Sequence, residues 1–182
     1  MTTDIDLLDT VVSQTGALVA GASRTGHDTP TPCPEFDVTS LVNHLVGWAK
    51  SFAATLSGEK FDGDPNSYVA GPDPAAEYNE AAQKVVAAYR EGGKAAQQTP
   101  VGLLLMEEIV HGWDLAIATG QDVPFSAEAA EAALAAGRGM LKPEFRGPGK
   151  SFAEEVAVAE DVSSVDRLVA FLGRDPEWAP AA

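Results

Sequence analysis

Cysteine and basic residues are scarce in this chain of 182 residues. Its single cysteine, Cys33, excludes an intrachain disulfide and any zinc ribbon built from cysteine pairs. Twelve lysine and arginine residues stand against 27 aspartate and glutamate residues, which gives a formal net charge of −15. That charge repels a phosphate backbone or an anionic lipid surface, so we expect neither nucleic acid nor membrane partners.

A membrane-spanning run and a basic N-terminal segment are lacking as well. No stretch approaches the roughly 18 apolar residues that a transmembrane helix needs. The opening residues, MTTDIDLLDT, carry acidic side chains where a secretory signal peptide carries basic ones. We therefore expect a cytoplasmic protein.

The chain has the composition of an ordinary globular domain, with 45% hydrophobic and 21% charged residues. Apolar residues recur at helical spacing along most of it, and no alternation typical of a strand persists. Prolines and glycines separate the periodic stretches. The predicted helices cover residues 4–22, 38–58, 74–98, 101–118, 126–141 and 162–173. This pattern predicts an all-α bundle.

Individual residues indicate where some of the predicted helices begin, and the helices suggest two parts of the chain. Asp37 is suited to cap the second helix, and Pro74 is suited to the first turn of the third. We expect residues 1–141 to form a helical bundle. Residues 142–182 are expected to form a C-terminal extension with one short helix that packs on the bundle. Its last segment, RDPEWAPAA, is expected to fray.

The stretch MEEIVHGWDLAIATG, residues 106–120, places polar side chains inside an apolar helix. Glu107 and His111 are four residues apart, so they project from one face and can close on one metal ion. Glu108 is a rival for Glu107, because a pair at i, i+3 can also close on a metal with His111.

A second histidine, His44, lies on the apolar side of the second predicted helix, between Leu41 and Trp48. If this helix is a neighbour of the helix that carries Glu107 and His111, the three side chains can converge. Two histidines and a carboxylate are a familiar set for zinc, iron, nickel or manganese, and three protein ligands leave a position open for water or substrate. The alternative is that the histidines are hydrogen-bonded core residues.

Several other residues have two interpretations each. Asp114 either orients a ligand histidine as a hydrogen-bond acceptor, or caps or pairs with another helix. Cys33 is either a reactive thiol or, as we favour, a small buried hydrophobe in a Pro-Cys-Pro turn. Trp48 and Trp113 are expected in the core or at an interface, and His27 in a solvated loop. Three arginines are candidate partners of an anionic cosubstrate, without a predicted location: Arg24, Arg138 and Arg146.

Three segments resemble the signatures of a known family: TPCPEFDVTSLVNHLVGWAKSFA, EEIVHGWDLAIATG and DRLVAFLGRDPEW. Together they are similar to actinobacterial DinB-like metal-binding proteins, which are relatives of mycothiol-dependent maleylpyruvate isomerase. The resemblance implies an up-down-down-up, DinB-like four-helix bundle with one or two additional helices and a divalent metal between helices. It implies that the ligands are His44, Glu107 and His111, and it favours Glu107 over Glu108.

The resemblance also implies a function for the metal. A low-molecular-weight thiol such as mycothiol would bind it and attack an electrophile, as in a thiol transferase or an isomerase. We expect zinc, with nickel, iron or manganese as alternatives. The characterised isomerases carry an extra C-terminal domain, for which residues 142–182 are too few. The alternative function is a non-catalytic metal-binding or interaction module, which would form a homodimer.

Overall fold

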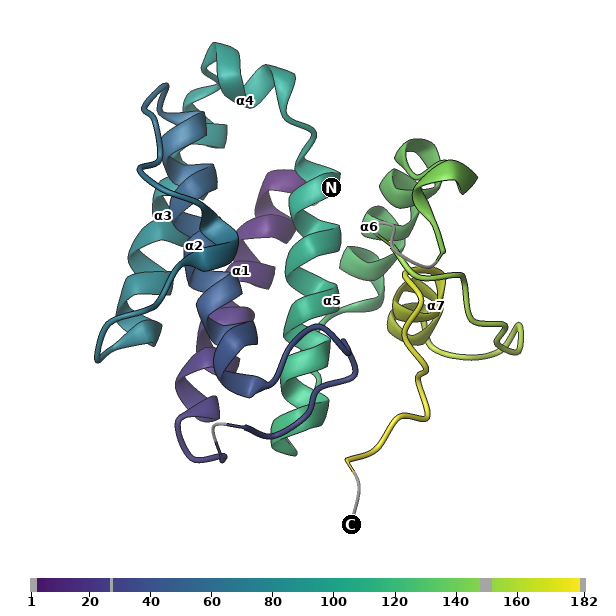
Figure 1. Ribbon diagram of the computed structural model, residues 1–182. Helices are drawn as coiled ribbons and strands as arrows, with labels where there is room; N and C mark the ends of the chain where they lie inside the picture. The colour runs from purple at the N-terminus through teal and green to yellow at the C-terminus, as the bar shows by residue number, and fades with distance from the viewer. Residues whose placement is uncertain (1–2, 27, 148–151, 181–182) are drawn as a thin grey trace.

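Helices form the regular structure of residues 3–26, 28–147 and 152–180, which the computed structural model describes (Figure 1). In chain order they are α1 (Asp4–Ala22), α2 (Val38–Leu56), η1 (Pro65–Ser67), α3 (Pro74–Glu91), α4 (Lys94–Gln98), α5 (Val101–Thr119), α6 (Ala127–Met140), η2 (Pro143–Phe145) and α7 (Ser164–Phe171). These residues contain no strand, only two isolated bridges. None of the described helices is both long and apolar enough to cross a membrane. The predicted all-α class is confirmed.

Four long helices form the central bundle. α1 packs against α3 and α5, and α2 packs against the same two helices from the other side. α1 and α5 run in one direction while α2 and α3 run in the other, which is the predicted up-down-down-up order (Figure 1). Because α2 and α3 are parallel neighbours, the connection of residues 57–73 must return along the length of the bundle.

Capping residues determine where these helices begin and end. Asp37 accepts a hydrogen bond from the backbone N–H of Ser40 at 2.7 Å, and the Ser40 hydroxyl accepts one from the N–H of Asp37 at 2.9 Å. Pro74 occupies the first turn of α3, as predicted. α5 is followed by Gly120, whose φ of 67° is a left-handed conformation that glycine adopts without strain. Side-chain hydrogen bonds therefore define the start of α2, the helix that carries His44.

The helix predicted for residues 74–98 is two helices in the structure, so that prediction was wrong. α3 ends at Glu91, and Gly92 takes a left-handed φ of 66°. Gly93 then precedes the short α4. The alanine, glutamine and lysine content of this stretch favours helix, but two consecutive glycines have low helix propensity and allow the chain to turn.

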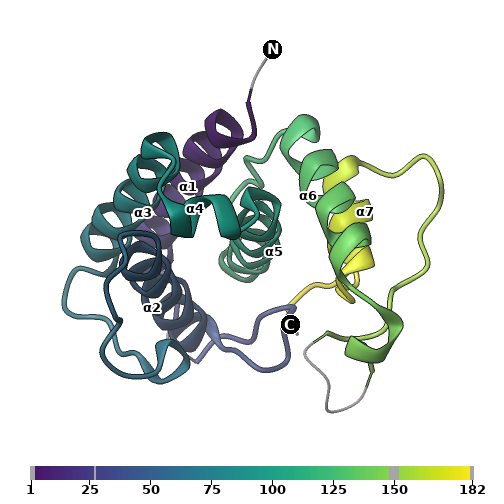
Figure 2. The same cartoon turned by 90° about the horizontal axis from the view of Figure 1, so that it is seen from above.

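α6 and α7 lie on the side of α5 that faces away from α2 and α3 (Figure 2). α7 packs on both α6 and α5. Since α1 and α2 cover its other side, α5 is enclosed, and its polar Glu108, His111 and Asp114 are buried. Buried polar side chains are stable only with partners, which makes α5 the helix of most functional interest. The division into residues 1–141 and 142–182 stays a prediction.

Candidate metal centre

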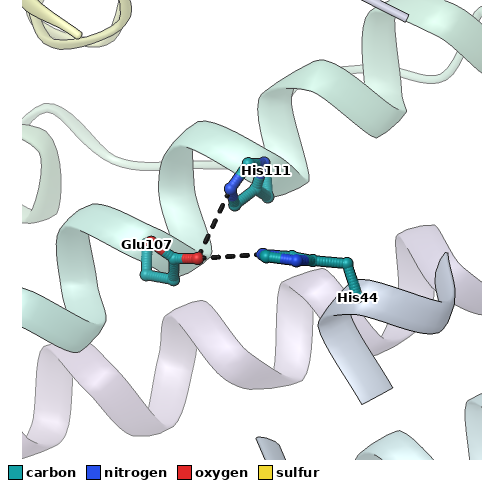
Figure 3. A group of neighbouring side chains, drawn as sticks. All are labelled: His44, Glu107 and His111. Carbon is teal, nitrogen blue, oxygen red and sulfur yellow. Dashed lines mark hydrogen bonds and ion pairs between the residues drawn. The ribbon is translucent and has the colours of Figure 1, made fainter. Parts of the chain in front are cut away.

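Three potential metal ligands from two helices meet at one point (Figure 3). His44 projects from α2, while Glu107 and His111 project from successive turns of α5, which packs beside α2. Glu107 Oε1 lies 3.0 Å from His44 Nε2 and 3.4 Å from His111 Nε2. One ligand atom from each of the three residues lies within 4.8 Å of the others. The structure therefore brings together the three side chains that the sequence singled out.

This donor set fits a divalent metal ion. Zinc binds imidazole nitrogen and carboxylate oxygen at about 2.0–2.2 Å in tetrahedral geometry, which separates its ligand atoms by about 3.4 Å. The two separations from Glu107 Oε1 are close to that value. Both histidines present Nε2, and three protein ligands leave one tetrahedral position for water or substrate. The side chains thus suit a metal that keeps an open coordination position.

Attraction between the opposite charges of Glu107 and His111 shifts the pKa values of both side chains. Burial alone would raise the pKa of Glu107, but the charge of His111 and the hydrogen bonds of both histidines hold this pKa well below its usual range. Burial alone would lower the pKa of His111, but the carboxylates of Glu107 and Asp114 raise it to about 9. Since a ligand imidazole must be neutral, a metal bound here would displace a proton from His111.

Asp114 connects this cluster to the C-terminal part of the chain. Its side chain is fully buried, and its Oδ2 lies 3.1 Å from His111 Nδ1, within a hydrogen bond. Arg174, which follows α7, donates from Nη2 to Oδ2 at 3.1 Å and from Nε to Oδ1 at 3.3 Å. Asp114 therefore contacts a candidate ligand and pairs with another element at the same time, so its two interpretations are not exclusive.

Glu108, the rival carboxylate, has other partners. Its Oε2 accepts a hydrogen bond from the Tyr78 hydroxyl of α3 at 2.5 Å, and its backbone oxygen accepts one from Thr15 Oγ1 of α1 at 3.5 Å. Burial raises the pKa of Glu108 to about 7. Its carboxylate is not part of the cluster that His44 forms with α5.

The cluster opens into a cleft of about 490 Å³, whose wall includes Cys33, Phe36, Trp48, Asn66, Phe152 and Arg174. The ring centroids of Phe36 and His44 are 4.7 Å apart. Trp48 donates from Nε1 to Asn66 Oδ1 at 3.0 Å. Trp48 therefore borders the cleft instead of lying in the core, whereas Trp113, at 2% exposure, is a core residue as expected.

Cys33 lies on the same wall but is only 5% exposed. The Thr31 hydroxyl donates to the Cys33 carbonyl oxygen at 2.9 Å and accepts from the Cys33 N–H at 3.2 Å, which holds the turn. Burial raises the pKa of the Cys33 thiol. A buried thiol with a raised pKa is a poor nucleophile, which agrees with the favoured interpretation of a small buried hydrophobe.

The sequence is similar to those of known proteins. The family model of the mycothiol maleylpyruvate isomerase N-terminal domain matches residues 8–116, more than half of the chain. The chain belongs to this family. Two relatives come from Mycobacterium tuberculosis: Uncharacterized protein MT0763 (strain CDC 1551 / Oshkosh) and Uncharacterized protein Rv0738 (strain ATCC 25618 / H37Rv). Each is 35% identical over 169 residues, which covers 87% of this chain and 90% of the relative. No solved structure matches the chain.

The match to the isomerase N-terminal domain includes the three candidate ligands and Asp114 but ends before α6. Arg174 lies beyond it, in the segment RDPEWAPAA, and the expectation of fraying was wrong for this residue. The feature of the sequence that could have pointed to Arg174 is its position in the third family-like segment, DRLVAFLGRDPEW. The arginines considered instead do not line the cleft: Arg24, Arg138 and Arg146. His27 lies outside the described residues.

Proposed function

We propose that this family member is a metal-dependent enzyme that uses a low-molecular-weight thiol of the mycothiol type, as a transferase or an isomerase. The observation that supports this most is the convergence of His44 Nε2, Glu107 Oε1 and His111 Nε2 on the wall of an open cleft. Zinc is the favoured metal, with nickel, iron or manganese as alternatives, because all of them accept imidazole and carboxylate ligands.

Each part of the site has a separate role in this proposal. The three ligand side chains hold the cation, and a thiol that binds such a cation loses its proton at neutral pH. Asp114 holds the ring of His111 through its Nδ1 atom. Phe36 and Trp48 place apolar rings beside the ligands, which limits the access of water to the reacting groups. A cleft of about 490 Å³ is within the range of small-molecule sites.

The proposed partners are a small thiol and a small electrophile. A net charge of −15 argues against nucleic acid and anionic membranes as further partners. The proposed setting is the cytoplasm, where low-molecular-weight thiols are kept reduced.

Elemental analysis of protein purified without nickel resin tests the metal. The wild type is expected to carry a stoichiometric divalent ion. His44→Ala and His111→Ala are expected to lose this ion while they keep the helical circular dichroism of the wild type. Retained metal in either variant contradicts the ligand assignment.

Cobalt substitution tests the thiol. Addition of mycothiol to the cobalt-loaded protein is expected to change the visible absorption, because a thiolate replaces water at the open position. The His111→Ala protein serves as the control and is expected to show no such change. An unchanged spectrum and an unchanged melting temperature in the wild type would instead identify a non-catalytic metal-binding module.

A further inference from the structure

We propose that Arg174 is a positioning residue of the metal centre, which acts through Asp114 on the candidate ligand His111. The inference rests on the metal centre proposed above and extends it to the segment that follows α7. Arg174 is 60 residues away from Asp114 in the sequence, yet its side chain is only 12% exposed because it reaches into the protein to that carboxylate.

Arg174 is the cationic partner of the Asp114 carboxylate inside the protein. The Asp114 side chain has no exposed surface, and a buried carboxylate without a cationic partner is costly. The guanidinium contacts both carboxylate oxygens, with Nη2 at 3.1 Å from Oδ2 and Nε at 3.3 Å from Oδ1. A planar fork of this kind fixes the orientation of the carboxylate as well as its charge.

The Asp114 side chain in turn orients the ring of His111 through a hydrogen bond. A carboxylate only accepts hydrogen bonds, so it holds an imidazole proton at Nδ1, which is 3.1 Å from Oδ2. In the neutral ring the lone pair is then at Nε2, the atom that lies 3.4 Å from Glu107 Oε1. A histidine held in one tautomer and one orientation is a better metal ligand than a free one.

Arg174 is itself held in place by the end of α7. Its backbone N–H donates to the Val169 carbonyl at 2.9 Å, and its Nη1 donates to the Leu172 carbonyl at 3.1 Å. α7 packs on α6 and α5. A continuous series of contacts therefore leads from α7 through Arg174 and Asp114 to His111.

Zinc affinity, measured by competition with a chelating dye, and the visible spectrum of the cobalt form test this role. Arg174→Met and Asp114→Asn are each expected to weaken zinc binding about 10- to 100-fold and to shift the cobalt spectrum. Arg174→Lys keeps the positive charge but cannot contact both carboxylate oxygens of Asp114 in the same way, so an intermediate loss of zinc affinity is expected. Arg167→Met is the matched control, because it removes an ion pair of α7 with Glu131 and leaves Asp114 untouched. Its affinity is expected to equal that of the wild type.

The double variant decides whether Arg174 acts through Asp114. In the Asp114→Asn background, Arg174→Met is expected to cause no further loss of zinc affinity. Additive losses, or a wild-type affinity and spectrum in Arg174→Met, overturn the proposal. If circular dichroism shows that Arg174→Met does not fold, Arg174→Lys in the two backgrounds makes the same comparison.

The two proposals fail in different ways. A wild type that binds neither zinc nor cobalt removes the metal centre, and the role of Arg174 falls with it. A wild type that binds both, together with an Arg174→Met protein that binds equally well, removes only the role of Arg174.

Discussion

Glu107 and Glu108 follow each other in the sequence but have different surroundings, because successive residues project about 100° apart around a helix. Glu107 meets His44 of α2, and Glu108 meets Tyr78 of α3. The histidines keep the pKa of the partly buried Glu107 low, whereas burial raises the pKa of Glu108 to about 7. Of these two glutamates, Glu107 is therefore the one that is fully ionised at neutral pH.

A pair of substitutions distinguishes the two carboxylates. Glu107→Gln is expected to lower the zinc affinity by about 100-fold or more, since an uncharged amide oxygen replaces a ligand that zinc prefers. Glu108→Gln is expected to change it by less than about threefold, because the altered carboxylate lies outside the cluster of candidate ligands. Competition titrations measure both. Equal losses would favour Glu108 as a ligand and contradict the assignment.

The sequence predicted which candidate ligand side chains would meet, but it did not predict that Arg174 contacts Asp114 next to them. The i, i+4 spacing of Glu107 and His111 is a local property of a helix, and the apolar face of α2 directs His44 inward. The preference for Glu107 over Glu108 came from the family resemblance, because the rotation of α5 against its neighbours depends on tertiary packing. Arg174 has no local pattern that shows which buried carboxylate it reaches.

At the scale of elements, helix bounds were predictable where a side chain or glycine marks them. Asp37 and Ser126 cap α2 and α6 near the predicted starts. The last helix, predicted for residues 162–173, is shorter because Ser163 caps it and Gly173 takes a φ of 84°. The break at Gly92 was missed because the surrounding residues favour helix.

A cluster of polar side chains ties together α2, α3 and the segment between them. Glu77 Oε2 accepts hydrogen bonds from the Tyr68 hydroxyl at 2.5 Å and from Lys50 Nζ at 2.9 Å. Its Oε1 accepts one from the Gly71 N–H at 2.6 Å. The segment also carries Asn66 on the cleft wall. The position of that wall therefore depends on Glu77.

The stabilisation from these hydrogen bonds of Glu77 is expected to depend on pH. The hydrogen bonds of Tyr68 and Lys50 lower the pKa of Glu77 from 4.5 to about 2. Because the pKa of the folded state is the lower one, the stabilisation is complete above pH 4.5 and is lost as the pH falls toward 2. Glu77→Gln is expected to flatten the fall of the unfolding free energy over this range. Glu80→Gln, which removes an exposed pair with Lys84, is expected to change it little. If the unfolding free energy falls equally steeply with pH in both variants, Glu77 is not the source of the pH dependence.

Two glycine substitutions are expected to have opposite effects. At Gly47 of α2, an added Cβ would lie 2.4 Å from the Pro65 carbonyl oxygen and 2.7 Å from Tyr68 Cβ. Gly47→Ala is therefore expected to lower the unfolding free energy by about 1–3 kcal/mol. At Gly139 of α6, a Cβ has no neighbour within 4 Å, and Gly139→Ala is expected to raise it by about 0.5–1 kcal/mol. Urea denaturation measures the unfolding free energy of both variants. If both substitutions changed it in the same direction, the close packing of Gly47 on η1 would be contradicted.

At the scale of the whole molecule, α5 is shared by two groups of helices. α1 and α2 pack on one side of it, and α6 and α7 pack on the other (Figure 2). The proposed metal centre takes its ligands from α2 and α5, and Arg174 approaches the same place from the end of α7. Metal binding at this position can therefore affect both groups.

Zinc is expected to stabilise the C-terminal helices as well as the bundle. A ligand that binds only the folded state adds about 2.7 kcal/mol at 100 times its Kd, which corresponds to a rise of about 5–10 °C in the melting temperature of a chain this size. Amide hydrogen exchange is expected to slow in α5 and α7. The smallest change is expected in α4, which among the described helices packs on α2 and α3 but not on α5 or α7.

Arg174→Met tests how this stabilisation reaches α7. At saturating zinc, exchange in this variant is expected to slow in α2 and α5 but not in α7, because the path through Asp114 is cut. The coupling is reciprocal, so the same variant that uncouples α7 from zinc must also bind zinc more weakly. Equal slowing in α7 of both proteins would mean that the effect passes through the packing of α6 on α5, and that the Asp114 contact carries none of it.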